Sequence, residues 1–142
     1  MPTRADLSGA AEHEGGHTPL MRAALDGETE TVKRLLSSGA DVNERDEEGR
    51  TALMFAVTNL HGDSAKALLE RGADPNAKAN DGSTALMLAA SSGDSEIVRD
   101  LLSKGADVTA KFTETGKTAL MIAKEKGYTD IVDSLQSSGA KH

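Results

Sequence analysis

A four-residue segment recurs along the chain at a nearly constant spacing. Thr18-Pro19-Leu20-Met21 returns as Thr51-Ala52-Leu53-Met54, Thr84-Ala85-Leu86-Met87 and Thr118-Ala119-Leu120-Met121, at spacings of 33, 33 and 34 residues. A glycine stands two residues before each threonine, and a Gly-Ala-Asp segment starts at Gly39, Gly72 and Gly105, with a shortened Gly139-Ala140 at the end. Three markers in one register indicate four copies of one supersecondary unit.

Each copy is typical of two short helices joined by a turn. In the first copy, the Thr18 hydroxyl is placed to accept a backbone N–H and so to cap a helix over 19–26. Gly27 follows that helix, and a left-handed turn costs glycine little. A second helix is expected over 28–37, where apolar residues keep the i, i+3, i+4 spacing of one buried stripe. A polar turn then leads to the next cap.

One such pair cannot bury both of its apolar faces, so neighbouring pairs must stack and share a continuous core. The sequence divides into repeats over about 13–45, 46–78, 79–112 and 113–142, which we expect to form a single domain after a flexible leader over 1–12. The last repeat has Lys124 and Gln136 where earlier repeats have Ala and Leu. This change predicts a C-terminal cap with a polar outer face.

Charge and composition exclude several classes of partner. The formal net charge is −7 and the Lys and Arg residues form no run, whereas a nucleic-acid binder needs a basic face. The same charge gives no support for binding to an anionic membrane. The chain has no cysteine and no apolar run of about 18 residues, so disulfides and membrane spans are not expected. We therefore predict a cytoplasmic monomer that binds neither nucleic acid nor membrane.

The 33-residue period, with its Thr-Pro-Leu start and its Gly-Ala-Asp-Val-Asn end, resembles the ankyrin repeat over about residues 13–142. The resemblance implies an all-α solenoid of stacked helix-turn-helix units with projecting β-turns and a concave face. Members of this family overwhelmingly bind proteins through the turn tips and the exposed side of the first helix. It therefore implies a non-catalytic protein–protein interaction module, or scaffold, without a cofactor.

Three features depart from the family pattern. The family usually has histidine after Thr-Pro-Leu, where this chain has methionine; we expect core packing there, with a Met-rich binding stripe as the alternative. Leu60 stands where the other repeats have glycine between their helices, and leucine disfavours a left-handed backbone. The turn is therefore predicted to move to Asn59 or Gly62. One residue inserted around 113–115 lengthens the last turn.

Two short motifs resemble catalytic signatures. The segment from His13 to His17 matches H-E-x-x-H, in which a helix places both imidazoles on one face for zinc and Glu14 would act as base. Two glycines inside the motif and the cap that follows it argue against a helix. A metal-dependent hydrolase using His13, Glu14 and His17 is thus the alternative function, and we predict no metal site. Gly116-Lys117-Thr118 falls in the register of the repeat turns, so we interpret it as a turn and not as a phosphate-binding loop.

The repeat register also names the residues of the candidate binding face, at the turn tips and at the ends of the first helices. These residues are Arg45, Glu47, Glu48, Arg50, Thr58, Asn59, Lys78, Asn80, Asp81, Ser83, Ser91, Ser92, Lys111, Thr113, Glu114, Lys117, Glu125 and Lys126. Interface hot spots are usually Trp, Tyr or Arg, which this set nearly lacks, and Phe55 on a first helix is predicted to be core. We expect modest affinity and charge-steered binding of another protein, whose identity the sequence leaves open. A structural array without a specific partner is the remaining alternative.

Overall fold

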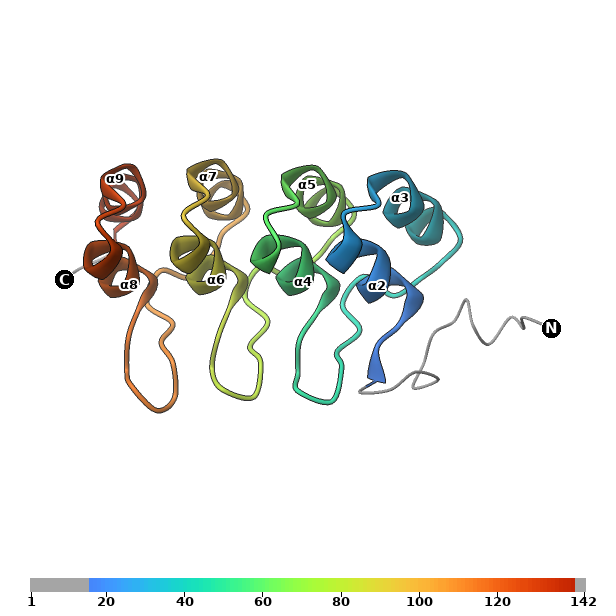
Figure 1. Cartoon of the computed structure of the whole chain (residues 1–142), viewed down its shortest axis with the longest axis horizontal. Coiled ribbons are helices and arrows are strands. Elements are labelled where there is room, and N and C mark those ends of the chain that lie inside the picture. The colour runs from blue at the N-terminus through green and yellow to red at the C-terminus, as the bar shows by residue number, and fades with distance from the viewer. Residues whose placement is uncertain (1–15, 140–142) are drawn as a thin grey trace.

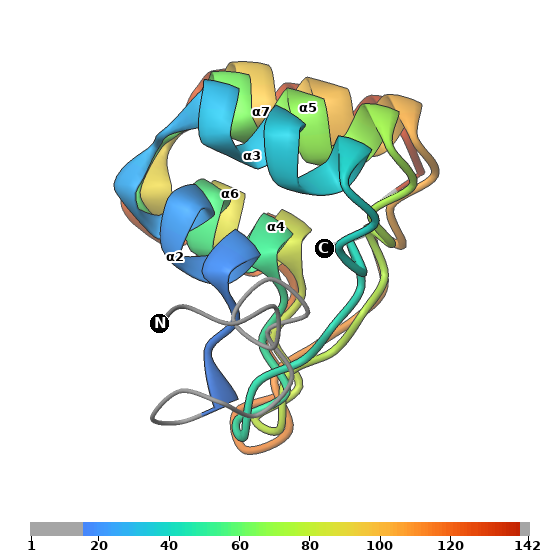
Figure 2. The ribbon, with the colours of Figure 1, turned by 90° about the vertical axis from the view of Figure 1, so that its right-hand side faces the viewer.

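The computed structural model describes residues 16–139, and the predicted leader over 1–12 lies outside them. Eight helices in this part of the chain form four consecutive pairs (Figure 1): α2 Pro19–Asp26 with α3 Thr29–Ser37, α4 Ala52–Thr58 with α5 Gly62–Glu70, α6 Ala85–Ser92 with α7 Ser95–Ser103, and α8 Ala119–Lys126 with α9 Thr129–Ser137. The first helices of the pairs stack in an inner row and the second helices in an outer row, as Figure 2 shows from the end. This arrangement confirms the predicted all-α solenoid.

Every inner helix begins at the threonine that marks its repeat. The hydroxyl of Thr18 accepts the backbone N–H of Met21 at 3.1 Å. The threonines that cap α4, α6 and α8 make the equivalent bond, with lengths of 3.3–3.4 Å. Thr18 also donates its own N–H to the Met21 Sδ at 3.4 Å, so the sulfur closes a reciprocal capping box. The recurring segment is thus a helix-start signal, as predicted.

The core lies between the two rows of helices and runs along the whole described stack. Each helix pair contributes leucines that are at most 2% exposed: Leu20, Leu53, Leu86 and Leu120 from the inner row, and Leu68, Leu101 and Leu135 from the outer row. Met21, Met54 and Met87 are buried among them, which confirms the predicted core packing for these three methionines but not for the fourth. Met121, in the last repeat, is 36% exposed.

The last helix pair has the polar outer surface that the sequence predicts. Lys124 and Gln136 are exposed, whereas Ile131 and Leu135 of α9 face the core. The repeat therefore contributes apolar contacts on one side only, which is how a terminal repeat ends a solenoid.

The turn between α4 and α5 differs from the prediction. Leu60 itself adopts the left-handed conformation, with φ of 64°, whereas Asn59 keeps a negative φ and Gly62 begins α5. Neighbouring side chains hold this turn, because Asn59 Nδ2 donates to the Leu25 carbonyl at 2.8 Å and His61 Nε2 lies 3.0 Å from the same oxygen. These contacts to the first repeat offset a backbone cost of roughly 1–2 kcal/mol.

A hairpin loop joins each pair to the next, and the three loops project from the same side of the stack (Figure 1). Asp46 and Gly49 close the first loop, since the Gly49 N–H donates to the Asp46 carbonyl at 3.0 Å. In the last loop the Gly116 N–H reaches back four residues, to the Phe112 carbonyl at 2.9 Å. The inserted residue therefore widens the last loop, as predicted. None of the helices in the described residues is long and apolar enough to cross a membrane.

Candidate protein-binding face

Hydrogen bonds join each loop to the next and set the spacing of the loop tips. The Asn80 N–H donates to the Glu48 carbonyl at 2.8 Å, and the Thr113 N–H donates to the Asp81 carbonyl at 3.0 Å. Asn80 Nδ2 adds a bond to the Glu47 carbonyl at 3.1 Å. Because the backbone of each tip is fixed in this way, its exposed side chains are presented in a preorganised array.

Two asparagines, each just before one of these loops, bond to the backbone that follows the next outer helix. Asn43 Oδ1 accepts the N–H of Asp74 at 2.8 Å, and its Nδ2 donates to the Gly72 carbonyl at 3.2 Å. Asn76 makes the same pair of bonds to Asp107 and Gly105 in the following repeat. Each of these chain segments therefore links two helices covalently and is also hydrogen-bonded to the following repeat.

A buried carboxylate organises the first loop. The Asp46 side chain is 0% exposed and accepts the backbone N–H groups of Glu48 and Arg50 at 2.9 and 2.8 Å, and Arg50 Nε at 3.0 Å. Burial by itself raises the pKa of Asp46, but these hydrogen bonds and the nearby guanidinium outweigh it and lower the pKa below its ordinary value of 3.8. His17 Nε2 also lies 3.2 Å from Asp46 Oδ2, without the alignment of a hydrogen bond.

Asp46 connects the loop with the inner row of helices. The Arg50 guanidinium that it holds lies over the Phe55 ring of α4, 5.0 Å from the ring centroid, and His17 meets the same ring edge-on at 5.4 Å. Phe55 is 8% exposed, which confirms the prediction that it is core. The repeat register does not mark Asp46, because the loops of the later repeats have Ala79 and Phe112 at its position.

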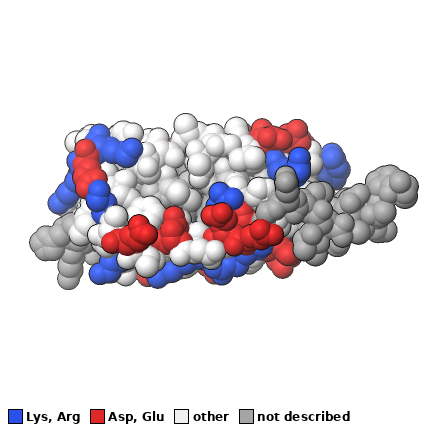
Figure 3. Space-filling model, turned by 60° about the horizontal axis from the view of Figure 1, so that its bottom comes forward, with Lys and Arg blue, Asp and Glu red and all other residues white. Residues whose placement is uncertain are grey.

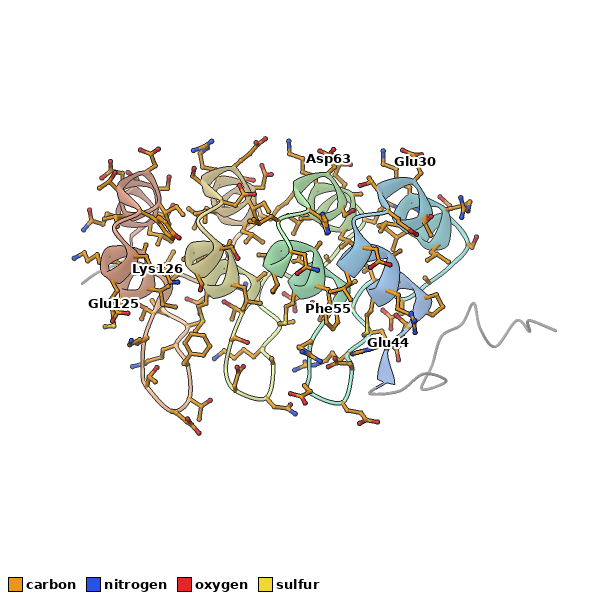
Figure 4. All side chains as sticks on the ribbon, viewed as in Figure 1. Glu30, Glu44, Phe55, Asp63, Glu125 and Lys126 are labelled. Carbon is orange, nitrogen blue, oxygen red and sulfur yellow. The ribbon has the colours of Figure 1, made fainter. Side chains whose placement is uncertain are left out.

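Most of the candidate residues lie exposed on this one face. The exposed members are Arg45, Glu47, Glu48, Lys78, Asn80, Asp81, Lys111, Thr113 and Glu114 on the loops, and Thr58, Asn59, Glu125 and Lys126 at the ends of α4 and α8. Figure 4 labels Glu125 and Lys126. Arg50, Ser91, Ser92 and Lys117 are half-buried. Lys117 Nζ pairs with Glu125 Oε1 at 3.0 Å, so a loop and an inner helix meet in this surface.

Ser83 does not belong to the accessible surface. It is 5% exposed, and its hydroxyl and N–H both donate to Asp81 Oδ1, at 2.7 and 2.9 Å. These two bonds, the hydroxyl first, hold the pKa of Asp81 below its ordinary value despite partial burial. Ser83 supports the loop from within, because its short side chain bends back toward the turn.

Charged residues of the loops form two rows that follow the repeat period. Arg45, Lys78 and Lys111 recur at intervals of 33 residues, and so do the carboxylates of Glu48, Asp81 and Glu114. All six residues are exposed. We call the second set the carboxylate row. Figure 3 shows acidic groups gathered along this face and basic groups along its lower edge.

Two adjoining hollows lie beside the carboxylate row. The first has a volume of about 400 Å³ and is lined by Asn80, Asp81, Phe112, Thr113, Glu114, Thr115 and Lys117. The second, of about 380 Å³, is lined by Glu48, Arg50, Ala79, Asn80, Asp81, Ser83 and Glu114. They share Asn80, Asp81 and Glu114, so together they form one groove across the loops. Phe112 supplies the aromatic wall and packs against the core below.

The alternative metal site falls largely outside the structure. His13 and Glu14 lie outside the described residues, and His17 directs Nε2 toward Asp46. No group of three or more His, Asp or Glu side chains within residues 16–139 is arranged to hold a metal ion. The described part of the chain thus gives the hydrolase alternative no support.

Comparison with known proteins agrees with this architecture. The family model described as ankyrin repeats, in three copies, matches residues 5–79 and again residues 76–142. A search of the curated proteins found no match. Ankyrin repeats are in general protein–protein interaction modules and are typically non-enzymatic. With four stacked helix pairs in its described residues and family matches along nearly its whole length, the chain belongs to the ankyrin-repeat family.

Proposed function

We propose that the chain is a non-catalytic module that binds a partner protein through the loop tips and the exposed side of the inner helices. The observation that carries this proposal is the hydrogen-bonded series of loops, from Glu48 to Asn80 and from Asp81 to Thr113. A surface whose backbone is already fixed loses little conformational entropy on binding. Its exposed side chains are therefore available for contact at low entropic cost.

The chemistry of this face suggests how it binds. Charged and amide groups dominate it, whereas the aromatic rings of Phe55 and Phe112 are largely covered. Charged rims mainly raise the rate of encounter and select partners. We expect modest affinity and an association rate that falls as salt is added. A cytoplasmic location and a monomeric state stay predictions from composition.

Charge reversal combined with affinity capture from the source cell tests the proposal. Lys78 and Lys111 are the best positions, because both are exposed and neither is in an ion pair among the described residues. Arg45 and Arg50 are poorer choices, since Arg45 donates to the Lys78 carbonyl and Arg50 binds Asp46. The double variant Lys78→Glu with Lys111→Glu should change the amount of partner that is captured: capture of an acidic partner should be lost, and capture of a basic partner should increase.

The matched control is Arg34→Glu with Arg99→Glu, which makes the same change in net charge on the outer helices α3 and α7. This control should capture the same proteins as the unmodified chain. Equal capture by both double variants would place the binding surface elsewhere. Capture of nothing above background by the unmodified chain would favour a structural array without a partner.

A further inference from the structure

The carboxylate row is a set of like charges, and the charge of Arg50 stabilises only its Asp81 member. Glu48 and Glu114 take part in no ion pair among the described residues. The two cations that line the groove are already held by other carboxylates, Arg50 by Asp46 and Lys117 by Glu125. The groove therefore presents net negative charge to whatever enters it.

Hydrogen bonds fix the backbone that carries the row, and they also fix the carboxylate of Asp81. The Glu48 and Asp81 carbonyls accept bonds from the next loop, and Asp81 is further held by both donors of Ser83. Rows of like charge on a rigid scaffold raise the local concentration of opposite charge and favour cationic ligands. The row follows the stack across three loops, so a ligand that meets all of it must be extended.

The hollow at the end of the row supplies an apolar contact. Its wall is the Phe112 ring, and residues of the widened last loop line it next to that ring. A volume of about 400 Å³ is ample for one large aliphatic or aromatic side chain. The first and second loops have Asp46 and Ala79 in place of Phe112, so the apolar wall is specific to the last loop.

We propose that the groove binds an extended segment of the partner that places an apolar side chain against Phe112 and Lys or Arg side chains along Glu48, Asp81 and Glu114. This inference rests on the proposed function and names the chemistry of its partner. Phosphate groups and acidic segments are repelled by the same row. Arg45, Lys78 and Lys111 line neither hollow, so these cations do not compete with the segment for the carboxylates.

A displayed library of random peptides, selected on the unmodified protein, is the probe. The enriched peptides should share an apolar residue flanked by Lys or Arg. Their affinity is then measured against two groove variants. Thr113→Trp fills the hollow without removing a core contact, because Thr113 is exposed, and should weaken binding at least about tenfold. Glu114→Gln removes one charge of the row and should weaken binding about two- to fivefold.

The controls repeat these changes on the outer helices. Thr129→Trp on α9 and Glu70→Gln on α5 alter exposed side chains outside the groove and should leave the affinity unchanged. Circular dichroism of each variant shows whether the helices are retained. Two substitutions of Phe112 test the apolar wall itself. Phe112→Leu keeps an apolar side chain there and should lower the peptide affinity less than Phe112→Ala.

The outcomes separate this inference from the proposed function. If the peptides share the motif and respond to the groove variants alone, both stand. If the peptides respond to variants elsewhere on the loop face but not to Thr113→Trp or Glu114→Gln, the inference fails and the proposed function survives. If binding responds only to the outer-helix variants, both fail. Enrichment of acidic peptides, or of none, also overturns the inference.

Discussion

Replacing Asp46 by alanine tests whether a buried, hydrogen-bonded carboxylate on this face stabilises the fold more than an exposed one does. Asp46 accepts three hydrogen bonds and its side chain is 0% exposed, whereas its neighbour Glu47 is exposed. The next loop shows that alanine is compatible with this backbone. Ala79 makes the same pair of main-chain bonds, to Ser83 and Gly82, at 2.9 Å each. Asp46→Ala should therefore fold and lose stability.

The loss can be worked out from the three bonds. A hydrogen bond to a charged group contributes about 1.5–3 kcal/mol, so three bonds at face value give about 5 kcal/mol or more. The freed N–H of Glu48 lies in an exposed loop and regains water, and the Arg50 side chain, which is 41% exposed, is already partly solvated. After this discount, the free energy of unfolding should fall by about 2–3 kcal/mol.

Urea unfolding at neutral pH measures the difference, with Glu47→Ala as the matched control. The control should change the free energy of unfolding by less than about 0.5 kcal/mol. A loss below about 1 kcal/mol for Asp46→Ala, or one equal to the control, would show that the Asp46 bonds do not stabilise the loop.

The difference in stability between the unmodified chain and Asp46→Ala should also depend on pH. The pKa of Asp46 is lower in the folded chain than its ordinary value of 3.8. A lowered pKa contributes stability above the unfolded value, and this contribution is lost as the pH falls through the folded value. The difference between the unmodified chain and Asp46→Ala should therefore stay constant from neutral pH to about pH 5 and shrink below pH 3.8. A difference that grows on acidification would contradict this assignment.

Three further variants test the helix ends. Gly127→Ala should cost about 1 kcal/mol, because its φ of 76° strains alanine while its added Cβ meets nothing within 4 Å. Gly93→Ala should lower the free energy of unfolding further, although its φ of 81° is nearly the same, because the added Cβ would lie 2.9 Å from Tyr128 Cζ. Equal losses for the two variants in urea unfolding would show that this contact has no effect. Thr51→Ala removes the cap on the Met54 N–H and should cost about 1 kcal/mol, and an unchanged unfolding midpoint would contradict the capping role.

The fold was largely predictable because the repeat register carries its own local signals. Threonine caps, glycine turns and the i, i+3, i+4 stripes act within a few residues, so the inner helix of the first repeat begins and ends where the sequence predicts. The outer helix starts at Thr29, one residue later than predicted. Lys124 and Gln136, which stand where earlier repeats have apolar residues, likewise predicted the C-terminal cap, and both are exposed.

What failed depended on contacts between repeats. Leu60 takes a left-handed turn because Asn59 and His61 contact the carbonyl of Leu25, which lies 34 and 36 residues away along the chain. Local propensity carries no information about bonds over such separations. The groove beside Phe112 was missed for the same reason, because it is lined by two loops. Ser83 is the exception: it has the register of an exposed turn residue, but its hydroxyl bonds Asp81 only two residues away and so becomes buried.

Site-specific photo-crosslinking tests the central claim most directly, namely that the loop side of the stack is the binding surface. A photoreactive amino acid is placed in separate variants at Glu47 and Asn80 on the loops, and at Glu30 and Asp63 on the outer helices α3 and α5 (Figure 4). Each variant is irradiated with the captured partner. We predict covalent adducts from the two loop positions alone. Adducts from Glu30 or Asp63, with none from the loops, would contradict it.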